Sequence, residues 1–303
     1  MTLLKITNLS KNFGSFSAVN DVTFTLEKGD MLGFLGRNGA GKSTTFRMIL
    51  GLIEPSSGSI LFENKKIAGS NFDEIGFLPE ERGLHTNFTV EEELRYMAGL
   101  KGLSLKDVRK KIDYWLNKFN IDENKSKKIS TLSKGNQQKI QLIASLLHEP
   151  KLLILDEPFS GLDPLNVEVL KSAIKDINEN GTTIIFSSHR LDHIEELCNK
   201  VAILNKGNLL EYGTLSEVKS TSQQKKVLIE TTEDISCLSN ISGVINVYKN
   251  NNTTILTIEK EDDYKKIFQY IKKLDFVSHF QIMKPSINDI FIELVEDKEE
   301  TES

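Results

Sequence analysis

Length, composition and charge exclude several classes of protein before any motif is considered. The chain has 303 residues, of which 39% are hydrophobic and 27% charged, as in ordinary globular proteins that bury a core of normal size. Its formal net charge of -5 argues against a general nucleic-acid binder, which needs basic surface to neutralise phosphates.

No apolar run approaches the roughly 18 residues of a membrane span, and the first residues do not resemble a signal peptide. We therefore expect a cytosolic or peripheral protein. The 2 cysteines, Cys198 and Cys237, lie far apart in no metal-ligand spacing, which fits a reducing compartment.

The first eighty residues are predicted to form strands around one helix. Apolar segments that read as strands lie at residues 4–9, 18–26, 31–35, 60–62 and 75–78. The segment 31–35 is a short apolar run ending in glycines, which indicates a buried strand of a parallel sheet. A helix is expected to follow it from about Gly41.

The middle of the chain changes to helical spacing. Apolar residues recur every three or four positions from Val90 to Asn120, with a glycine break, and again from Ile140 to Leu147. Residues 152–155 and 183–186 are predicted to be buried strands. Cys198 is expected to be buried on an apolar helix face with Leu191, Ile194, Leu197 and Val201. Strands that alternate with helices imply an α/β fold with a mostly parallel sheet.

A second, smaller region follows a polar segment. Residues 219–226 are polar and are predicted to be a linker, although a solvated helix end would look similar. Strand-like and helix-like segments alternate beyond it, which indicates a small α+β domain. We therefore expect a first domain at 1–218, a linker at 219–226, an accessory domain at 227–295 and a disordered acidic tail at 296–303.

A phosphate-binding loop is predicted after the strand at 31–35. The pattern G-x-x-x-x-G-K-[ST] is matched by Gly36, Arg37, Asn38, Gly39, Ala40, Gly41, Lys42 and Ser43, and Thr44 follows in the same site. Glycines let successive backbone N–H groups point at phosphate oxygens, and the helix N-terminus adds partial positive charge. Lys42 can reach the β- and γ-phosphates, and the Ser43 hydroxyl can ligate Mg²⁺.

Two adjacent carboxylates end the apolar strand at 152–155. In P-loop enzymes the first acid at such a strand end holds Mg²⁺, so we assign Asp156 to the metal. The next carboxylate can orient or deprotonate the attacking water, and we assign Glu157 to that role. By itself an acidic residue after a strand is usually a solvated cap, so the assignment depends on the phosphate loop.

The phosphate loop and the acidic pair, together with a third motif at residues 132–138, make the sequence similar to the ATP-binding cassette (ABC) ATPases. The resemblance covers roughly residues 2–217. Residues 132–138, Leu-Ser-Lys-Gly-Asn-Gln-Gln, resemble the family signature LSGGQ. They keep Ser133 and Gly135 but depart from it at Lys134 and Asn136. The resemblance implies that Ser133 and Gly135 contact the γ-phosphate of a nucleotide held by the opposite subunit. Read alone, Ser133 would be an ordinary helix cap.

Three more segments follow the family order. Residues 160–163, ending in Asp163, resemble the family's D-loop and add Asp163 to the nucleotide-binding set. His189, in Ser-Ser-His, resembles the switch histidine that senses the γ-phosphate. Phe13 stands where the family places an aromatic ring that stacks on adenine, although it would otherwise read as a core aromatic.

One departure from the family lies at Glu80, in the stretch Leu-Pro-Glu-Glu-Arg-Gly-Leu, where glutamine is usual. A carboxylate can still ligate Mg²⁺, yet it adds repulsion toward the γ-phosphate. The competing interpretation is that the site has adapted to the acidic side chain of Glu80, with Glu81 or Arg82 compensating for its charge. The stretch and the C-terminal region resemble a subgroup that is paired with export permeases.

The resemblance implies an α/β fold, the P-loop NTPase ABC cassette. It has a RecA-like core with antiparallel β and helical subdomains, and here a small C-terminal α+β domain follows. It implies a subunit that hydrolyses ATP with Mg²⁺, in a pair of cassettes, expected as a homodimer, that sandwiches two ATP molecules. Closure would drive a separate integral-membrane permease, expected to be an exporter. We expect a peripheral protein on the cytoplasmic face of the membrane, with no nucleic-acid partner.

Two other functions stay open from the sequence. A ribosome-associated or DNA-repair ABC protein generally carries two cassettes or a long coiled coil, but this chain has one P-loop and no sustained heptads. A regulatory cassette that binds ATP without hydrolysing it is disfavoured by the intact Glu157 and His189.

Overall fold

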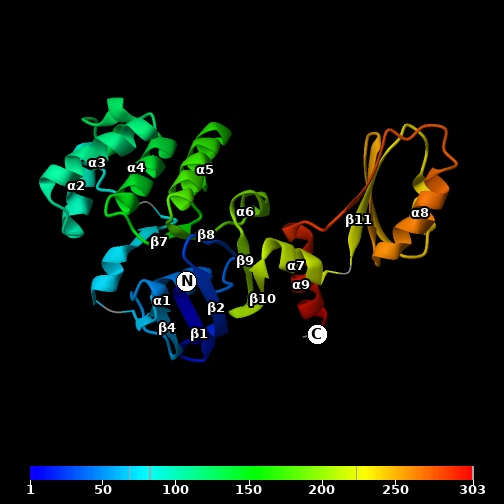
Figure 1. The fold of residues 1–303 in the computed structure, drawn as a ribbon, viewed down its shortest axis with the longest axis horizontal. Helices are drawn as coiled ribbons and strands as arrows, with labels where there is room; N and C mark the ends of the chain where they lie inside the picture. The colour runs from blue at the N-terminus through cyan, green and yellow to red at the C-terminus, as the bar shows by residue number, and fades with distance from the viewer. Residues whose placement is uncertain (68, 82, 223, 302–303) are drawn as a thin grey trace. The chain divides into compact units, whose positions relative to one another are not determined.

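The computed structural model describes residues 1–67, 69–81, 83–222 and 224–301. Its contacts divide the chain into two compact units, Met1–Tyr212 and Gly213–Ser303 (Figure 1). Among the described residues, no helix has both the length and the apolar character that a bilayer crossing needs.

The described part of the first unit is organised around one sheet, in the order β5-β4-β1-β2-β10-β9-β3-β8-β7-β6. Its strands are β1 (Thr2–Phe13), β2 (Phe16–Glu27), β3 (Met31–Leu35), β4 (Ser57–Phe62), β5 (Lys65–Lys66), β6 (Ile75–Leu78), β7 (Leu152–Asp156), β8 (Thr183–Ser187), β9 (Lys200–Asn205) and β10 (Asn208–Thr214). The five predicted strands of the first eighty residues, and those at 152–155 and 183–186, are all confirmed.

The parallel half of this sheet carries the predicted motifs. β3 pairs in parallel with β8 and β9, and β7 lies in parallel between β6 and β8. Every residue of β3, β7 and β8 is buried, as their continuous apolar runs predict. Because parallel strands end at the same edge, the segments after β3, β7 and β8 meet there.

The antiparallel half shares its core with the helix that follows β3. β1 pairs antiparallel with β2 and β4, and Gly14, at a φ of 60°, makes the turn between β1 and β2. Phe34 of β3 packs between Phe24 of β2 and Phe46 of α1, with ring centroids 5.7 and 5.3 Å away. This packing fixes α1 against the sheet directly behind the phosphate loop.

The helices of the first unit are α1 (Lys42–Ile49), α2 (Val90–Leu100), α3 (Leu105–Lys118), α4 (Lys134–Leu146), α5 (Pro164–Glu179) and α6 (Leu191–Leu197). The predicted break between α2 and α3 is confirmed, since Gly102 follows α2 with a φ of 73°. Thr89 and Glu92 form a capping box that starts α2, and Ser104 caps α3. Cys198 is buried as expected, but α6 ends at Leu197 and Val201 belongs to β9.

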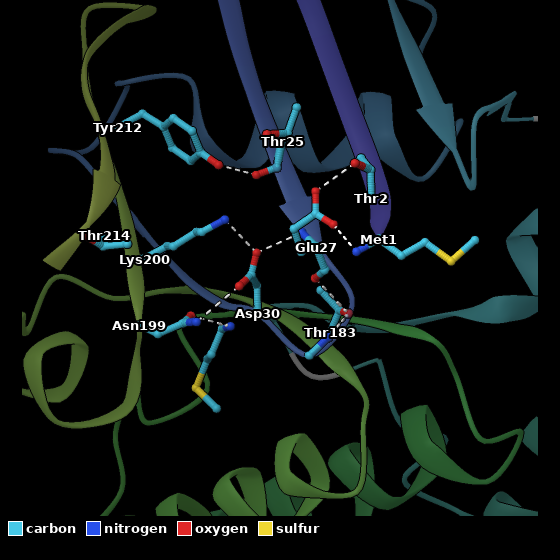
Figure 2. Close-up of polar contacts among 12 residues, drawn as sticks. Met1, Thr2, Thr25, Glu27, Asp30, Thr183, Asn199, Lys200, Tyr212 and Thr214 are labelled. Atoms are coloured by element: carbon cyan, nitrogen blue, oxygen red, sulfur yellow. Dashed lines mark hydrogen bonds and ion pairs between the residues drawn. The ribbon is translucent and has the colours of Figure 1, made fainter. Parts of the chain in front are cut away.

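A polar network connects several strands at the end of the sheet that lies opposite the phosphate loop (Figure 2). The buried Asp30 carboxylate accepts the Glu27 backbone N–H at 2.7 Å, pairs with the Lys200 ammonium at 2.8 Å and accepts the Asn199 amide at 3.1 Å. The Glu27 carboxylate in turn receives the Thr2 hydroxyl at 2.7 Å and pairs with the chain's terminal amine. These contacts tie β1, the β2–β3 turn and the start of β9 together.

The second unit contains an antiparallel sheet in the order β12-β13-β11-β14. Its elements are α7 (Leu215–Thr221), β11 (Lys225–Glu230), β12 (Val244–Asn250), β13 (Thr253–Ile258), α8 (Tyr264–Ile271), β14 (His279–Met283) and α9 (Ile287–Thr301). Val227, Leu256 and Ile267 belong to its core. An ion pair of 2.7 Å joins Lys226 of β11 to Asp289 of α9.

The boundaries differ from those expected at 218, 219–226 and 296–303. The contacts divide the chain after Tyr212, and the expected linker instead contains the end of α7 and the start of β11, with residue 223 outside the described part. A capping box of Thr214 and Glu217 starts α7. The last residues of this helix are polar, so in the sequence they resemble a linker. Helix α9 continues to Thr301 because glutamate and lysine favour helix, while residues 302–303 lie outside the described part.

We predict that Asp30→Ala lowers the free energy of unfolding of the first unit by about 3 kcal/mol, because it leaves a largely buried ammonium and a backbone N–H without their partner. Urea unfolding can be followed by the fluorescence of Trp115, the single tryptophan. Lys28→Ala is the matched control. Its ion pair with Glu63 is more exposed, so it should cost less than about 1 kcal/mol. Equal costs for the two variants would contradict the role of the network.

Candidate functional site

The loop between β3 and α1 has the backbone shape that the phosphate-loop pattern predicts. Gly39 and Gly41 adopt φ values of 81° and 101°, which side-chain-bearing residues rarely adopt. A Cβ on Gly36 would lie 2.8 Å from the Leu204 carbonyl oxygen. The loop therefore requires glycine at these positions to curl in front of the N-terminus of α1.

Lys42 lies at the centre of the site. Its ammonium donates to the backbone carbonyls of Gly36 and Arg37, at 2.6 and 3.3 Å. Burial lowers the pKa of Lys42, while the negative charges of Glu157, Asp156 and Glu80 act in the opposite direction. All three carboxylates thus lie close enough to this ammonium to act on it.

Asp156 is held by two hydroxyl groups. Ser43 donates to one carboxylate oxygen at 3.1 Å, and Ser187 donates to the other at 2.6 Å. The Ser187 hydroxyl also accepts the backbone N–H of Glu157 at 2.9 Å. Ser187 was not among the predicted site residues. Its only signal in the sequence is a hydroxyl at the end of an apolar strand, next to Ser188 and His189.

Glu157 and His189 contact each other directly. The Nδ1 atom of His189 lies 2.8 Å from Oε2 of Glu157, and Glu157 has a φ of 50°. This left-handed backbone is costly for a residue with a side chain, and such strain concentrates at functional sites. The hydrogen bond from its N–H to Ser187 helps to hold it.

These side chains line one cavity of about 680 Å³. Its lining residues are Phe16, Ala18, Asn38, Gly39, Ala40, Gly41, Lys42, Ser43, Thr44, Glu80, Asp156, Glu157 and His189. Residues 38–44 of the predicted phosphate loop, the acidic pair, the predicted switch histidine and Glu80 are therefore brought together, whereas Gly36 and Arg37 do not line the cavity. Arg82, considered as a compensating charge, lies outside the described residues.

The aromatic position differs from the expectation. Phe13 does not line the cavity, and its ring lies 5.2 Å from the Lys11 ammonium. Phe16, opposite Phe13 across the Gly14 turn, does line it. Both rings are exposed, by 52% and 63%, so the turn presents two aromatic faces beside the phosphate loop. A local motif comparison does not distinguish residues that face each other across a turn.

Ser133, Gly135 and Asp163 do not line this cavity. Ser133 caps α4, accepting the Asn136 N–H at 3.3 Å, and Asp163 caps α5, accepting the Asn166 N–H at 3.0 Å. A Cβ on Gly135 would lie 2.7 Å from the Asn166 side-chain nitrogen. The signature therefore packs through Gly135 against Asn166 of α5, the helix that follows the D-loop.

The donor set fits Mg²⁺. Two oxygen-bearing side chains, Ser43 and Asp156, lie 3.1 Å apart at the mouth of the phosphate loop. Mg²⁺ in nucleotide sites typically takes one or two protein oxygens and completes its shell with phosphate oxygens and water. Glu80 lines the same cavity and could supply a further oxygen.

Comparisons with known proteins agree with this geometry. Residues 19–160 match the family model described as "ABC transporter", and residues 213–295 match "ATP-binding protein DrrA1-3-like, C-terminal domain". An uncharacterized ABC transporter ATP-binding protein of Bacillus subtilis, YhaQ, is 43% identical over 97% of this chain and 98% of its own length. The bacitracin transport ATP-binding protein BcrA of Bacillus licheniformis is 34% identical over 97% of each chain.

A solved structure described as the ATP binding subunit of an ABC transporter is also similar. It is 34% identical, has a TM-score of 0.67, and the match covers 72% of this chain and 92% of that chain.

We predict that Ser187→Ala slows ATP turnover by about 10- to 100-fold, because Asp156 and the Glu157 backbone both lose their hydroxyl partner. ATP affinity should fall only when Mg²⁺ is present. Steady-state phosphate release and calorimetry with and without Mg²⁺ measure both effects. Ser188→Ala is the matched control, since Ser188 is also buried but its hydroxyl accepts the Arg190 N–H. An equal loss of turnover in both variants would show that Ser187 does not have this special role in holding Asp156 and Glu157.

Proposed function

This chain belongs to the ABC transporter ATP-binding family, whose members hydrolyse ATP to drive a separate permease, and we propose that it works as a homodimer that powers an exporter. The ATP hydrolysis on which this proposal depends is supported by one cavity that gathers Lys42, Asp156, Glu157 and His189 beside the phosphate loop. Export is supported by the similarity to the bacitracin transport protein, and by the match of residues 213–295.

The phosphate loop binds the triphosphate. The N–H groups of the curled loop and the N-terminus of α1 face phosphate oxygens, and Lys42 exchanges its carbonyl partners for the β- and γ-phosphates. The adenine ring stacks on the turn that carries Phe13 and Phe16, both of which are exposed. Ser43 and Asp156 would hold Mg²⁺, which would supply positive charge to the phosphates.

Glu157 prepares the attacking water. Its carboxylate, in contact with His189, accepts a proton from a water molecule in line with the γ-phosphate, while His189 senses that phosphate. Ser187 holds the backbone of Glu157 and His189 contacts its carboxylate, so both parts of the residue are positioned before ATP binds.

A second copy completes the site. Ser133 and Gly135 lie outside the cavity on their own chain, at the N-terminus of α4, where a hydroxyl and backbone N–H groups can bind phosphate. We place them, with Asp163, against the nucleotide of the partner copy. Two copies arranged in this way bind two ATP molecules between them.

The permease is proposed to bind a groove beside the Glu80 loop. This groove, of about 330 Å³, is lined mainly by apolar side chains, among them Leu50, Phe72, Phe77, Leu84, Met97 and Leu100. It includes Pro79, next to Glu80, and Gln141, whose amide donates to the Glu81 carbonyl at 3.3 Å. A permease segment in this groove would hold the chain at the cytoplasmic face of the membrane and would sense movement of Glu80.

We predict that Glu157→Gln binds Mg-ATP but hydrolyses it more slowly by about 10²-fold or more, because the amide cannot accept the proton of the water. ATP should then trap a dimer, which size-exclusion chromatography with light scattering detects. Glu149→Gln is the matched control, since Glu149 has a similar φ of 54° but lies outside the cavity. Near-normal turnover of Glu157→Gln would overturn the assignment of the base.

We predict that Glu80→Gln increases the preference for ATP over ADP by about fivefold, because it removes a negative charge beside the γ-phosphate. Turnover should survive, since the amide keeps an oxygen toward Mg²⁺. Calorimetry with ATP and ADP, with and without Mg²⁺, measures the change, and Glu81→Gln is the control. If the preference is the same in Glu80→Gln and the unmodified chain at every Mg²⁺ level, Glu80 is not beside the γ-phosphate.

A further inference from the structure

Three aromatic rings connect the segments that carry Glu157, Ser187 and His189. Phe159 follows Glu157 by two residues and packs edge-to-face on Phe186 of β8, with ring centroids 5.3 Å apart. Its other neighbour is the ring of His193 on α6, at 4.9 Å and an interplanar angle of 83°. Phe186 directly precedes Ser187, and α6 begins two residues after His189. The three rings therefore join the loop after β7, the end of β8 and the helix behind the switch histidine.

All three rings are buried, and of the three only His193 can gain a charge by binding a proton. It is 2% exposed, and its Nδ1 atom has no hydrogen-bond partner within the described part of the chain. Its Nε2 atom lies 3.9 Å from the Asp192 carboxylate, too far for a hydrogen bond. A buried imidazole whose Nδ1 atom lacks a hydrogen-bond partner packs as an uncharged ring, and a proton on it would place a charge against Phe159, two residues after Glu157.

We propose that His193 is a positioning residue for ATP hydrolysis, whose uncharged ring supports Phe159 and thereby Glu157, so that protonation of His193 makes hydrolysis sensitive to acid. The inference rests on the hydrolytic function proposed above and adds a regulatory input to it. No metal or nucleotide contact is assigned to His193.

The charges around His193 come from two elements and act in both directions. On α6 and at its start, Asp192 and Glu196 favour a proton on His193 and Arg190 disfavours it; Lys171 of α5 also disfavours it. Burial is the largest influence, and together these factors hold the pKa of His193 below its ordinary value near 6.5.

The sign of the pH effect follows from this direction. The uncharged ring is present at neutral pH, and the folded chain resists a proton that the unfolded chain accepts near pH 6.5. The stability of the native arrangement therefore falls as the pH drops below that value toward the lower pKa of the folded state. The loss is expected first at the ring stack, because the charge develops there.

The test is the pH profile of ATP turnover between about pH 5 and pH 8 for the full-length chain and two variants. His193→Phe keeps a ring against Phe159 but does not titrate. It should retain turnover at neutral pH and lose it at a lower pH than the unmodified chain. His193→Ala removes the ring and should lower turnover by about 10- to 100-fold at all pH values, with ATP affinity unchanged. His279→Phe, in the second unit, is the control and should keep the unmodified profile.

Identical acid limbs for His193→Phe and the unmodified chain would overturn the proposal, as would full turnover in His193→Ala. If His193→Phe does not fold, as judged by Trp115 fluorescence and ATP binding, His193→Gln replaces it. Glutamine does not titrate but also removes the ring, so turnover should fall at neutral pH, and the acid limb is compared after scaling each profile to its value at neutral pH. Absence of phosphate release from the unmodified chain at every pH would instead contradict the hydrolytic function itself, so the two failures are distinguishable.

Discussion

The positive charge of one lysine ammonium, in a cavity that three carboxylates also line, is the interaction on which the site depends. Lys42 is largely buried, and Asp156, Glu157 and Glu80 all act on its charge. Without that ammonium, the carboxylates would repel one another and any phosphate that approached them. With it, the carboxylates can divide their roles, because Asp156 is fixed by hydroxyl groups whereas Glu157 is paired with a histidine.

The sheet brings these groups together by its register. Asp156 of β7 stands opposite Ser187 of β8, and Phe34 of β3 also pairs with Ser187, so one hydroxyl lies beside both the acidic pair and the phosphate loop. The network around Asp30 holds the start of β3 and of β9, the strand that pairs with β3 in parallel (Figure 2). The candidate site therefore lies at the carboxyl ends of buried parallel strands, of which β3 and β9 are anchored at their other end.

Local patterns were sufficient to predict much of this arrangement. The phosphate loop, Asp156, Glu157 and His189 were identified from short motifs, and residues 38–44 of the loop line one cavity with the other three. Ser187 and Phe16 were not identified, because their roles arise from pairing between distant strands and across a turn. The helix expected to include Val201 ends at Leu197, since apolar spacing does not distinguish a helix face from the start of a buried strand. The end of α7 was predicted to be a linker because its residues are polar, and polar composition alone does not distinguish a solvated helix end from a linker.

The most direct test of the central claim is phosphate release from ATP by the purified chain, measured with Mg²⁺ and again after chelation. The account predicts release only with Mg²⁺, and none from Lys42→Ala, because the remaining carboxylates repel the nucleotide. Release that continues in excess chelator, or that Lys42→Ala leaves unchanged, would contradict it.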